Sequence, residues 1–318
     1  MKLTHSEVEK LISKYPVGNL VSFERIKQGF MNYSYIITTD QGRFVLRISK
    51  KTKKKKDRLF EIGMVNHLQG FPVPYYIKDN RNRYINTFKG HHYSIYLFLN
   101  GSMPKKTTKK LFKQVAFFLA KFHNKINSFE SGINRFSWYS FTDERADEFE
   151  KYLLKEIPEY ESEILYLKEE LLKNRLPENL PSGAIHCDVK RENILVHNRN
   201  LSGVVDFDNC QIGPFLLDLA IAINWFCTDW KGLDYRKTRK FLKFYEKYRK
   251  LSNEEKKSIF RAIKYAYLSH EFVDYYVFAK GIITHDYFQF GRKFFLPAAK
   301  KMNRKKFKKY TESRFFFF

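Results

Sequence analysis

The sequence predicts a mixed α/β (α+β) chain, with an antiparallel sheet near its N-terminus and mainly helices after it. Three short runs rich in β-branched and aromatic residues, 22–27, 34–39 and 43–48, are separated by turn signals that contain glycine and are typical of adjacent strands. Beyond residue 110 the apolar residues recur at helical spacing, over 111–122 and again over 143–175. Strands followed by helices favour one early sheet with a helical remainder.

The other elements follow from the same local signals. Segment 4–14 predicts a short amphipathic helix, with Ser6 and Glu9 as a capping box. A helix over 57–68 should end before the prolines at 72 and 74, and strands are expected over 75–85 and 93–99. Pro158 should break the long helical stretch, and further helices are predicted over 216–226, 234–249 and 253–276.

Composition limits the class of protein. The chain has 318 residues, of which 43% are hydrophobic, enough to bury a substantial core. Its three cysteines, Cys187, Cys210 and Cys227, form no Cys-x-x-Cys pair, so neither a disulfide framework nor a zinc site is indicated. The longest apolar stretch, 215–227, is too short to span a membrane, and the first residues do not form a signal peptide. We therefore expect a cytoplasmic protein without a membrane span.

The net charge of +25 raises nucleic acid as a partner. Basic residues gather at 50–56 and 304–309, but no recognition motif surrounds either run, so we expect no specific nucleic-acid partner. Weak binding to anionic surfaces and a nonspecific nucleic-acid binder remain as alternatives, the latter with steep salt dependence. The purpose of these runs, the oligomeric state and the order of the Phe315 to Phe318 end stay open.

Residues 185–208 contain the strongest functional pattern. Asp188 is followed five residues later by Asn193, and thirteen residues after that by Asp206. The runs 194–196 and 203–205 predict a β-hairpin, which would carry Asn193 at its entry and Asp206 at its exit. Both side chains offer the hard oxygen ligands that Mg²⁺ prefers, and Asp188 is suited to act as a general base for an acceptor hydroxyl. This is the layout of a phosphoryl-transfer site.

Alternatives exist for each residue taken alone. Asp188 can be a turn cap, Asp206 a carboxylate at a strand end, and Cys187 a small buried residue rather than a nucleophile. The order of the three residues, with His186 before the base and Asp218 after the hairpin, favours the catalytic interpretation. His186 and Asp218 are expected to support the site, Asp218 by accepting hydrogen bonds that brace the catalytic loop.

The motif His-Cys-Asp-Val-Lys-Arg-Glu-Asn, followed by Val-Val-Asp-Phe-Asp, resembles the aminoglycoside phosphotransferase and choline kinase superfamily. It also looks like the catalytic loop of protein kinases, but only twelve residues separate Asp206 from Asp218, which leaves no room for an activation segment. Within the superfamily the sequence is most similar to the bacterial homoserine kinase branch, on Leu-Pro-Ser-Gly-Ala-Ile-His and Leu-Asp-Leu-Ala-Ile-Ala-Ile-Asn-Trp-Phe-Cys.

This resemblance implies a two-lobed, protein-kinase-like fold, with a nucleotide-binding lobe over 1–99 and a catalytic and substrate-binding lobe over 100–318. It implies that Arg47 contacts the nucleotide phosphates, that Glu61 pairs with Arg47, and that backbone groups at Leu97 and Leu99 hold adenine. A solvated glutamate is the alternative for Glu61. A short loop at 29–32 would cover the phosphates, although a plain hairpin turn suits it equally.

The activity implied is the ATP- and Mg²⁺-dependent phosphorylation of a hydroxyl group on a small molecule, homoserine first, as in threonine biosynthesis. Choline or ethanolamine, an aminoglycoside and methylthioribose are alternative acceptors, and a non-catalytic relative of the spore-coat type is the alternative class. His123 is expected to be structural. Trp225 and Trp230, with Asn224, are candidates for the acceptor pocket, although core packing is the expected use of the tryptophans.

Overall fold

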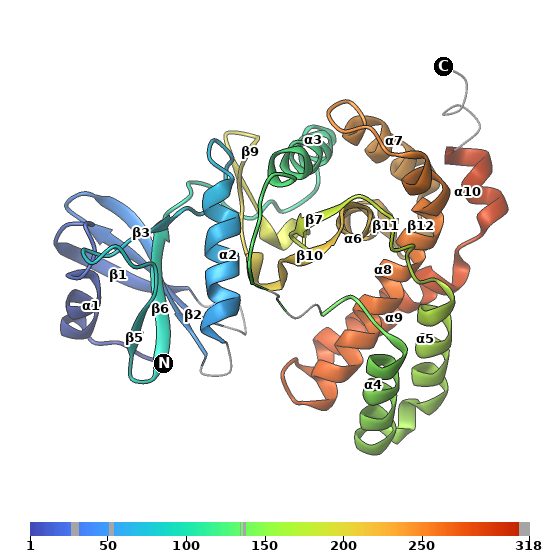
Figure 1. The fold of residues 1–318 in the computed structure, drawn as a ribbon, viewed down its shortest axis with the longest axis horizontal. Coiled ribbons are helices and arrows are strands. Elements are labelled where there is room, and N and C mark those ends of the chain that lie inside the picture. Colours follow the sequence, from blue (N-terminus) through green and yellow to red (C-terminus); the bar gives the residue numbers. More distant parts are fainter. Residues whose placement is uncertain (27–31, 51–53, 134, 136–137, 312–318) are drawn as a thin grey trace.

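The computed structural model describes residues 1–26, 32–50, 54–133, 135 and 138–311. Residues 29–31 of the expected phosphate loop, 51–53 of the first basic run and the Phe315 to Phe318 end lie outside these ranges. Figure 1 shows a sheet at one end of the molecule and a larger helical body at the other, with one helix, α2, standing between them. The predicted mixed α/β class is therefore confirmed.

The sheet is antiparallel throughout, with strand order β1-β2-β3-β6-β4 and β5 paired to β6. We call this sheet with α1 and α2 the sheet lobe. Its strands are β1 (Leu20–Ile26), β2 (Asn32–Thr39), β3 (Gly42–Ser49), β4 (Tyr76–Ile77), β5 (Asn86–Phe88) and β6 (His91–Leu97). The three expected strands at 22–48 are present as β1 to β3.

Two local predictions in this lobe are wrong. The cap of α1 (His5–Ile12) is Thr4, whose hydroxyl accepts from the Glu7 N–H while the Glu7 carboxylate accepts from the Thr4 N–H, so Ser6 lies inside the helix. Strand 75–85 ends after Ile77, because the Asp79 carboxylate accepts the backbone N–H groups of Arg81 and Arg83 and closes a turn.

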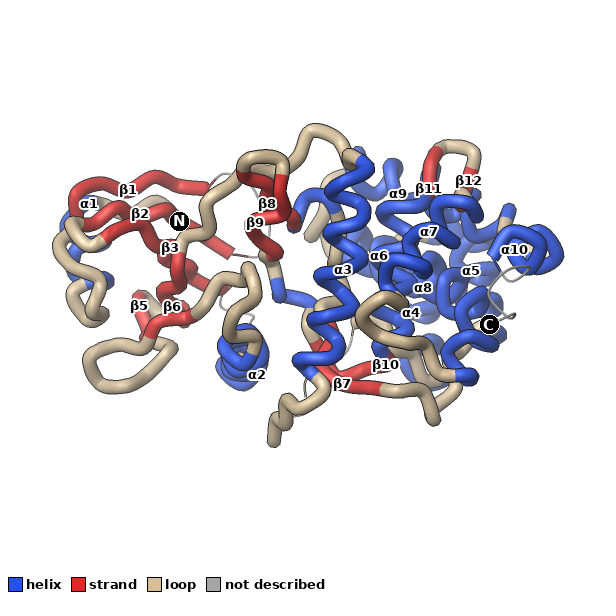
Figure 2. The backbone as a smooth tube through the Cα atoms, turned by 90° about the horizontal axis from the view of Figure 1, so that it is seen from above, coloured by secondary structure: helices blue, strands red, loops and turns tan. Residues whose placement is uncertain are grey.

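Two separate apolar clusters explain how the chain divides. Residues of α1 and of one sheet face pack together, including Val8, Leu11 and Leu46, all at most 1% exposed. Helix α2 (Lys55–His67) belongs to the other cluster, since Phe60 and Met64 are continuous with the core of the helical body. Figure 2 shows α2 between the sheet and the helices, so this helix joins the two parts by burying its apolar residues on the helical side.

In the described residues, the helical lobe consists of α3 to α10 with three short strand pairs. Its long helices form around a core of apolar residues, and Pro158 breaks the stretch 143–175 as predicted. Its helices are α3 (Lys109–Ile126), α4 (Asp143–Glu156), α5 (Glu161–Lys173), α6 (Phe215–Cys227), α7 (Tyr235–Tyr245), α8 (Asn253–Ala279), α9 (His285–Lys301) and α10 (Arg304–Thr311). The antiparallel strand pairs are β7 (Ser182–Ile185) with β10 (Gln211–Pro214), β8 (Ile194–His197) with β9 (Asn200–Val204), and β11 (Thr228–Asp229) with β12 (Gly232–Leu233).

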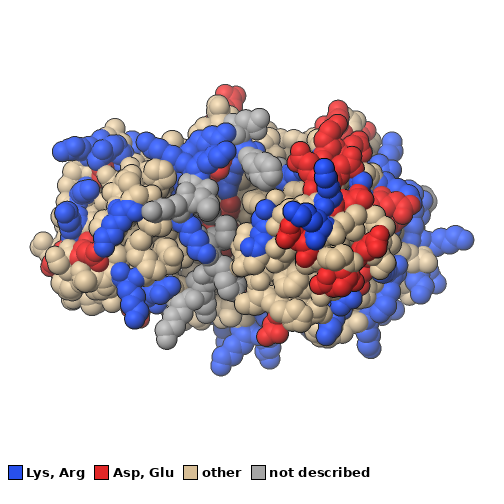
Figure 3. Space-filling view, turned by 90° about the horizontal axis from the view of Figure 1, so that it is seen from below, with Lys and Arg blue, Asp and Glu red and all other residues tan. Residues whose placement is uncertain are grey.

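On the face drawn in Figure 3, basic side chains are spread over the surface rather than gathered in one strip. Figure 3 shows lysine and arginine side chains over both lobes on this face, with acidic side chains concentrated over the helical lobe. Within the described residues, no helix has the length and apolar character needed to cross a membrane.

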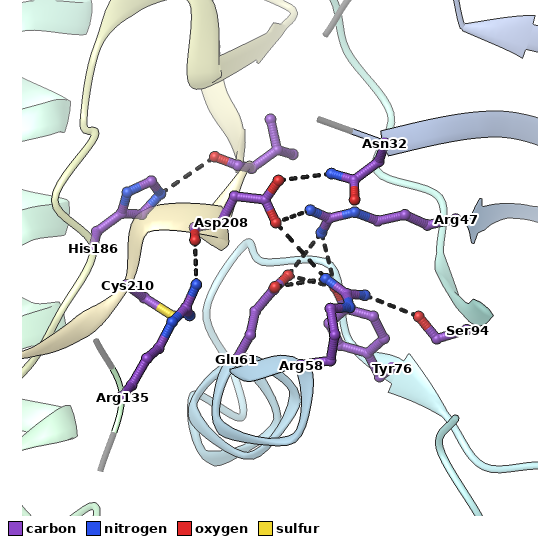
Figure 4. A network of polar contacts seen from close by, with 11 residues as sticks. Asn32, Arg47, Arg58, Glu61, Tyr76, Ser94, Arg135, His186, Asp208 and Cys210 are labelled. Carbon is purple, nitrogen blue, oxygen red and sulfur yellow. Dashed lines mark hydrogen bonds and ion pairs between the residues drawn. The ribbon is translucent and has the colours of Figure 1, made fainter. Parts of the chain in front are cut away.

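A buried polar network connects the lobes where α2 meets the sheet and the helical lobe (Figure 4). Arg47 on β3 pairs with Glu61 on α2 at 2.7 Å, and Arg58 pairs with the other oxygen of Glu61 at 2.6 Å. Asp208 of the helical lobe pairs with Arg47 and accepts from Asn32 Nδ2 at 2.6 Å. Arg47, Arg58 and Glu61 are each at most 5% exposed. Glu61 is therefore not the solvated glutamate of the alternative interpretation.

We predict that Glu61→Gln destabilises the protein by about 3–5 kcal/mol, because two buried guanidinium groups would then share the single charge of Asp208. Urea unfolding of the wild type and the variant measures this difference. The matched control is Glu169→Gln on α5, whose ion pair with Lys173 is exposed and should leave the unfolding midpoint unchanged. Equal midpoints for Glu61→Gln and the wild type would contradict the assignment.

Candidate active site

The segment that follows β7 is held by one buried carboxylate. Asp218, in the first turn of α6, accepts the backbone N–H of His186 at 2.9 Å and that of Cys187 at 2.8 Å. His123 Nε2 also lies 3.1 Å from Asp218. Burial opposes ionisation of Asp218, but the hydrogen bond from His123, with the backbone donors, holds its pKa below the ordinary value. Asp218 thus accepts the hydrogen bonds expected of it, and His123 is buried against it.

The backbone conformation of Cys187 is set by this arrangement. Its backbone adopts the left-handed region at φ 63°, which turns its N–H toward Asp218 and directs the next residue, Asp188, away from the strand. The thiol is buried, and burial raises its pKa well above the ordinary value. Cys187 is therefore a small buried residue at a strained turn, as expected, and an unreactive thiol.

His186 connects this turn to the β8–β9 hairpin. Its Nδ1 accepts the backbone N–H of Asp188 at 3.2 Å, and its Nε2 lies 3.2 Å from the carbonyl oxygen of Val205. One nitrogen thus accepts and the other donates, which requires a neutral ring. Burial lowers the pKa of His186 and favours that neutral form. The residue before Asp206 is thereby tied to the backbone of Asp188.

Asp188 is the buried carboxylate of the turn, with 4% of its surface exposed. One of its oxygens, Oδ2, accepts from Asn193 Nδ2 at 3.0 Å and lies 3.0 Å from Lys190 Nζ. The other, Oδ1, is buried without a hydrogen-bond partner among the described residues. Burial raises the pKa of Asp188, while the Lys190 charge opposes that rise. A carboxylate with a raised pKa and one oxygen that accepts no hydrogen bond from the described residues is suited to accept a proton.

Asn193 and Asp206 lie at the two ends of the hairpin, as predicted. The Asn193 carbonyl oxygen accepts the Val205 N–H at 2.9 Å, so the backbone places Asp206 directly beyond Asn193. Asn193 Nδ2 is taken by Asp188, through its Oδ2 and at 2.8 Å through its carbonyl oxygen, which leaves the amide oxygen as the group for a metal ligand.

Asp206 takes the left-handed conformation, at φ 65°. The residue is exposed, and the charges of Asp208, Arg47 and Asp188 act on its carboxyl group. Enclosure by protein raises its pKa, and the Asp208 and Asp188 charges add to the rise. An oxygen pair gathered among like charges is suited to hold a divalent cation.

The residues predicted for nucleotide contact lie on the other side of this group. Arg47 faces Asp208 and Glu61, so the expected Arg47–Glu61 pair is present (Figure 4). The Leu97 N–H donates to the Tyr75 carbonyl oxygen at 2.9 Å, which engages that donor within the sheet lobe. Leu99 lies beyond the end of β6 and packs close to Gly203 of β9, where the chain passes from one lobe to the other.

Three charged residues of the site were not predicted from the sequence. Lys190 stands two residues after Asp188, Asp208 two residues after Asp206, and Arg58 one helical turn before Glu61. Lys190 and Asp208 each lie two residues after a predicted site residue, so both could have been proposed from their position in the motif. Arg58 shows only an i,i+3 pair with Glu61, which is a common feature of exposed helices and gives no sign of burial.

The two tryptophans considered for the acceptor pocket have different positions. Trp225 is half-buried on α6, and Lys190 Nζ lies 5.4 Å from its ring centroid, which places it next to the Asp188 turn. Trp230 is 67% exposed and packs on Phe290 and Phe294 of α9, so the expected core role is wrong for it. The β11–β12 turn carries Trp230 out of the core.

The chain is similar to known proteins over most of its length. The model of the phosphotransferase enzyme family (APH) matches residues 22–251. The homoserine kinase of Bartonella tribocorum is 31% identical over 256 residues, covering 77% of this chain and 78% of the relative. The homoserine kinase of Neisseria meningitidis is 29% identical over 256 residues, covering 80% of this chain and 83% of the relative.

Solved structures show the same fold at low identity. An amicoumacin kinase in complex with AMP-PNP, Ca²⁺ and its ligand has a TM-score of 0.69 at 15% identity and covers 94% of each chain. A spectinomycin phosphotransferase in complex with ADP and spectinomycin has a TM-score of 0.63 at 14% identity, covering 98% of this chain and 99% of that one. With its family match and its kinase relatives, this chain belongs to the phosphotransferase enzyme family and is a small-molecule kinase that acts on a hydroxyl acceptor.

Proposed function

We propose that this kinase transfers the γ-phosphoryl group of ATP to the hydroxyl of homoserine, with Mg²⁺ as cofactor. The observation that carries the proposal is the arrangement of Asp188, Asn193 and Asp206: Asp188 accepts from Asn193 Nδ2, and Val205, next to Asp206, donates its N–H to the Asn193 carbonyl oxygen. Asp208 joins the same segment to Arg47, which pairs with Glu61. These side chains supply a base, two metal ligands and a phosphate contact, which phosphoryl transfer requires. The choice of homoserine is supported by the homoserine kinases among the relatives, which are 26–31% identical to this chain.

In this proposal the nucleotide lies between the lobes, with residues 1–99 binding it and 100–318 carrying the catalytic groups and the acceptor. Arg47, oriented by Glu61, contacts the phosphates as a planar fork. Adenine is held at the passage between lobes, by backbone groups of Leu97 and Leu99. Since Asp208 pairs with Arg47, the phosphates have to share Arg47 with Asp208 or displace it.

The donor set fits Mg²⁺, which prefers oxygen ligands and takes few from the protein. The Asn193 amide oxygen and the Asp206 carboxylate would hold it. When bound, the ion would neutralise charge on the phosphate oxygens. Asp188 accepts the proton of the acceptor hydroxyl at Oδ1, the oxygen without a partner, while Lys190 and Asn193 fix the position of the other oxygen.

The location of the reaction is proposed as the cytoplasm. The three cysteines are buried thiols, which suits a reducing compartment. Choline, ethanolamine, methylthioribose and aminoglycosides remain the acceptors to compare with homoserine, since low-identity structures with named ligands establish only the fold.

We predict that Asp188→Asn lowers turnover with homoserine by at least ~10²-fold, because the hydroxyl proton then has no acceptor, while ATP binding is retained. A coupled assay of ADP release, run over the panel of acceptors, measures the change. Glu192→Gln is the matched control, since it removes one exposed negative charge from the same turn and should keep full activity. Undiminished turnover in Asp188→Asn would remove Asp188 from the mechanism.

The pH dependence should report the state of Asp188, which must be ionised to accept a proton. Because burial raises its pKa above the ordinary 3.8, kcat/KM should fall on the acid side at a higher pH than for an ordinary aspartate. Lys190→Met removes a charge that lowers this pKa, so the acid limb should move to still higher pH. Rate profiles of both proteins test this, and a limb that moves to lower pH would contradict it.

A further inference from the structure

A chain of buried hydrogen bonds continues from Asp218 into the helical lobe. The two ring nitrogens of His123 on α3 lie 3.1 Å from Asp218 and 2.7 Å from the Tyr245 hydroxyl of α7. Arg249 donates to that hydroxyl at 3.1 Å and to the Glu255 carboxylate of α8 at 2.9 Å. The chain therefore runs from the first turn of α6 to the first turn of α8.

The residues of this chain are enclosed by packing. Four of the five are fully buried, and the fifth, Arg249, has 11% of its side chain exposed. Helices α3, α6 and α7, which carry three of them, pack against one another (Figure 1). The ring centroid of Phe215, at the start of α6, lies 4.8 Å from that of His123 and 4.9 Å from the Arg249 guanidinium carbon. Each of these two groups is thus held by an aromatic ring as well as by hydrogen bonds.

The chemistry of the two ends sets the direction of every hydrogen bond between them. An arginine can only donate, so the Tyr245 hydroxyl accepts from Arg249 and directs its own proton to His123 Nδ1. His123 Nε2 then carries the ring proton, which the Asp218 carboxylate accepts. Burial lowers the pKa of His123, and this favours the neutral ring. The ring is therefore held in one tautomer.

This tautomer determines what the Asp218 carboxylate meets. With the proton on Nε2, one carboxylate oxygen accepts from His123 and from the His186 N–H at 2.9 Å, while the other accepts from the Cys187 N–H. With the proton on Nδ1 instead, the Nε2 lone pair would face a buried carboxylate, which is unfavourable. The carboxylate would then have fewer donors to orient it against the turn that leads to Asp188.

A purely structural use of the same space would not require polar side chains. Replacing a buried ionic or polar group by well-packed apolar residues of similar volume is often neutral or stabilising. A polar chain in which each group has its partner specifies one arrangement of its members instead. Here one end of that arrangement is the carboxylate that holds the catalytic turn.

We propose that His123, Tyr245 and Arg249 are positioning residues for the phosphoryl transfer, because together they orient Asp218 and so fix the turn that carries Asp188. This rests on the proposed function, in which Asp188 is the base. The three residues act through Asp218 and not by contact with the nucleotide or the acceptor. Loss of a link in the chain should therefore lower kcat and leave KM for ATP and for the acceptor unchanged.

Tyr245→Phe tests this, since it removes the hydroxyl alone. We predict that kcat falls about tenfold, as expected for one lost hydrogen bond. Turnover is measured with whichever acceptor of the panel gives the highest rate, so that a failure of homoserine leaves the test intact. The matched control is Tyr265→Phe, which also removes a buried hydroxyl, one that accepts the Phe141 N–H at 3.1 Å, and should keep full kcat.

Nitrogen NMR of enzyme labelled at histidine reads the tautomer without any acceptor. The His123 signals are those that disappear in His123→Gln. In the wild type they should show a proton on Nε2 and a bare, hydrogen-bonded Nδ1, and in Tyr245→Phe the Nδ1 signal should move. Tyr265→Phe should leave both signals in place.

The outcomes separate this proposal from the proposed function. Equal kcat in Tyr245→Phe and Tyr265→Phe, or His123 signals that are the same in Tyr245→Phe and the wild type, would overturn the positioning role. Turnover with another acceptor but not with homoserine, together with the expected fall in kcat, would overturn homoserine and support the positioning role. A wild type without turnover on any acceptor would overturn both.

Discussion

The catalytic part of this molecule depends on the buried carboxylate of Asp218. Its two oxygens accept consecutive backbone N–H groups, from His186 and Cys187, and this fixes the direction in which the chain leaves β7. The strained backbone of Cys187 is the local consequence. Since α6, which carries Asp218, is almost wholly buried, the turn is anchored to the core of the helical lobe rather than to a mobile surface.

Hydrogen bonds and ion pairs connect this turn to the β8–β9 hairpin and to the sheet lobe. His186 hydrogen-bonds both the Asp188 N–H and the Val205 carbonyl oxygen, which keeps the proposed base and the proposed metal ligands together. Asp208, two residues further on, reaches the sheet lobe through Arg47, and α2 completes the connection with Glu61. The same short segment thus contacts both the catalytic turn and the other lobe, so the arrangement of the lobes and of the site are linked.

The parts that the sequence predicted well are those set by short-range rules. The hairpin from Asn193 to Asp206 and the helix break at Pro158 follow from local spacing and turn chemistry, and both are present. Thr4 and Ser6 each precede a glutamate by three residues, so the local pattern could not choose between them, and the helix begins where its apolar side meets the sheet.

Contacts between residues far apart in the chain could not be predicted from the sequence. Arg47 and Asp208 are 161 residues apart, and nothing local to either indicates that they meet. The same holds for Glu271 of α8, which is 1% exposed where α9 packs against α8. Both of its carboxylate oxygens are without a hydrogen-bond partner among the described residues, which becomes visible only when every neighbour is in place.

In the proposed function, Asn193 and Asp206 together hold one magnesium ion on the nucleotide. Titration calorimetry of a non-hydrolysable ATP analogue, with and without Mg²⁺, tests it most directly in the wild type, in Asp206→Ala and in the exposed control Asp229→Ala. We predict that Mg²⁺ strengthens nucleotide binding in the wild type and in the control, and has no such effect in Asp206→Ala. An undiminished effect of Mg²⁺ in Asp206→Ala would contradict the account.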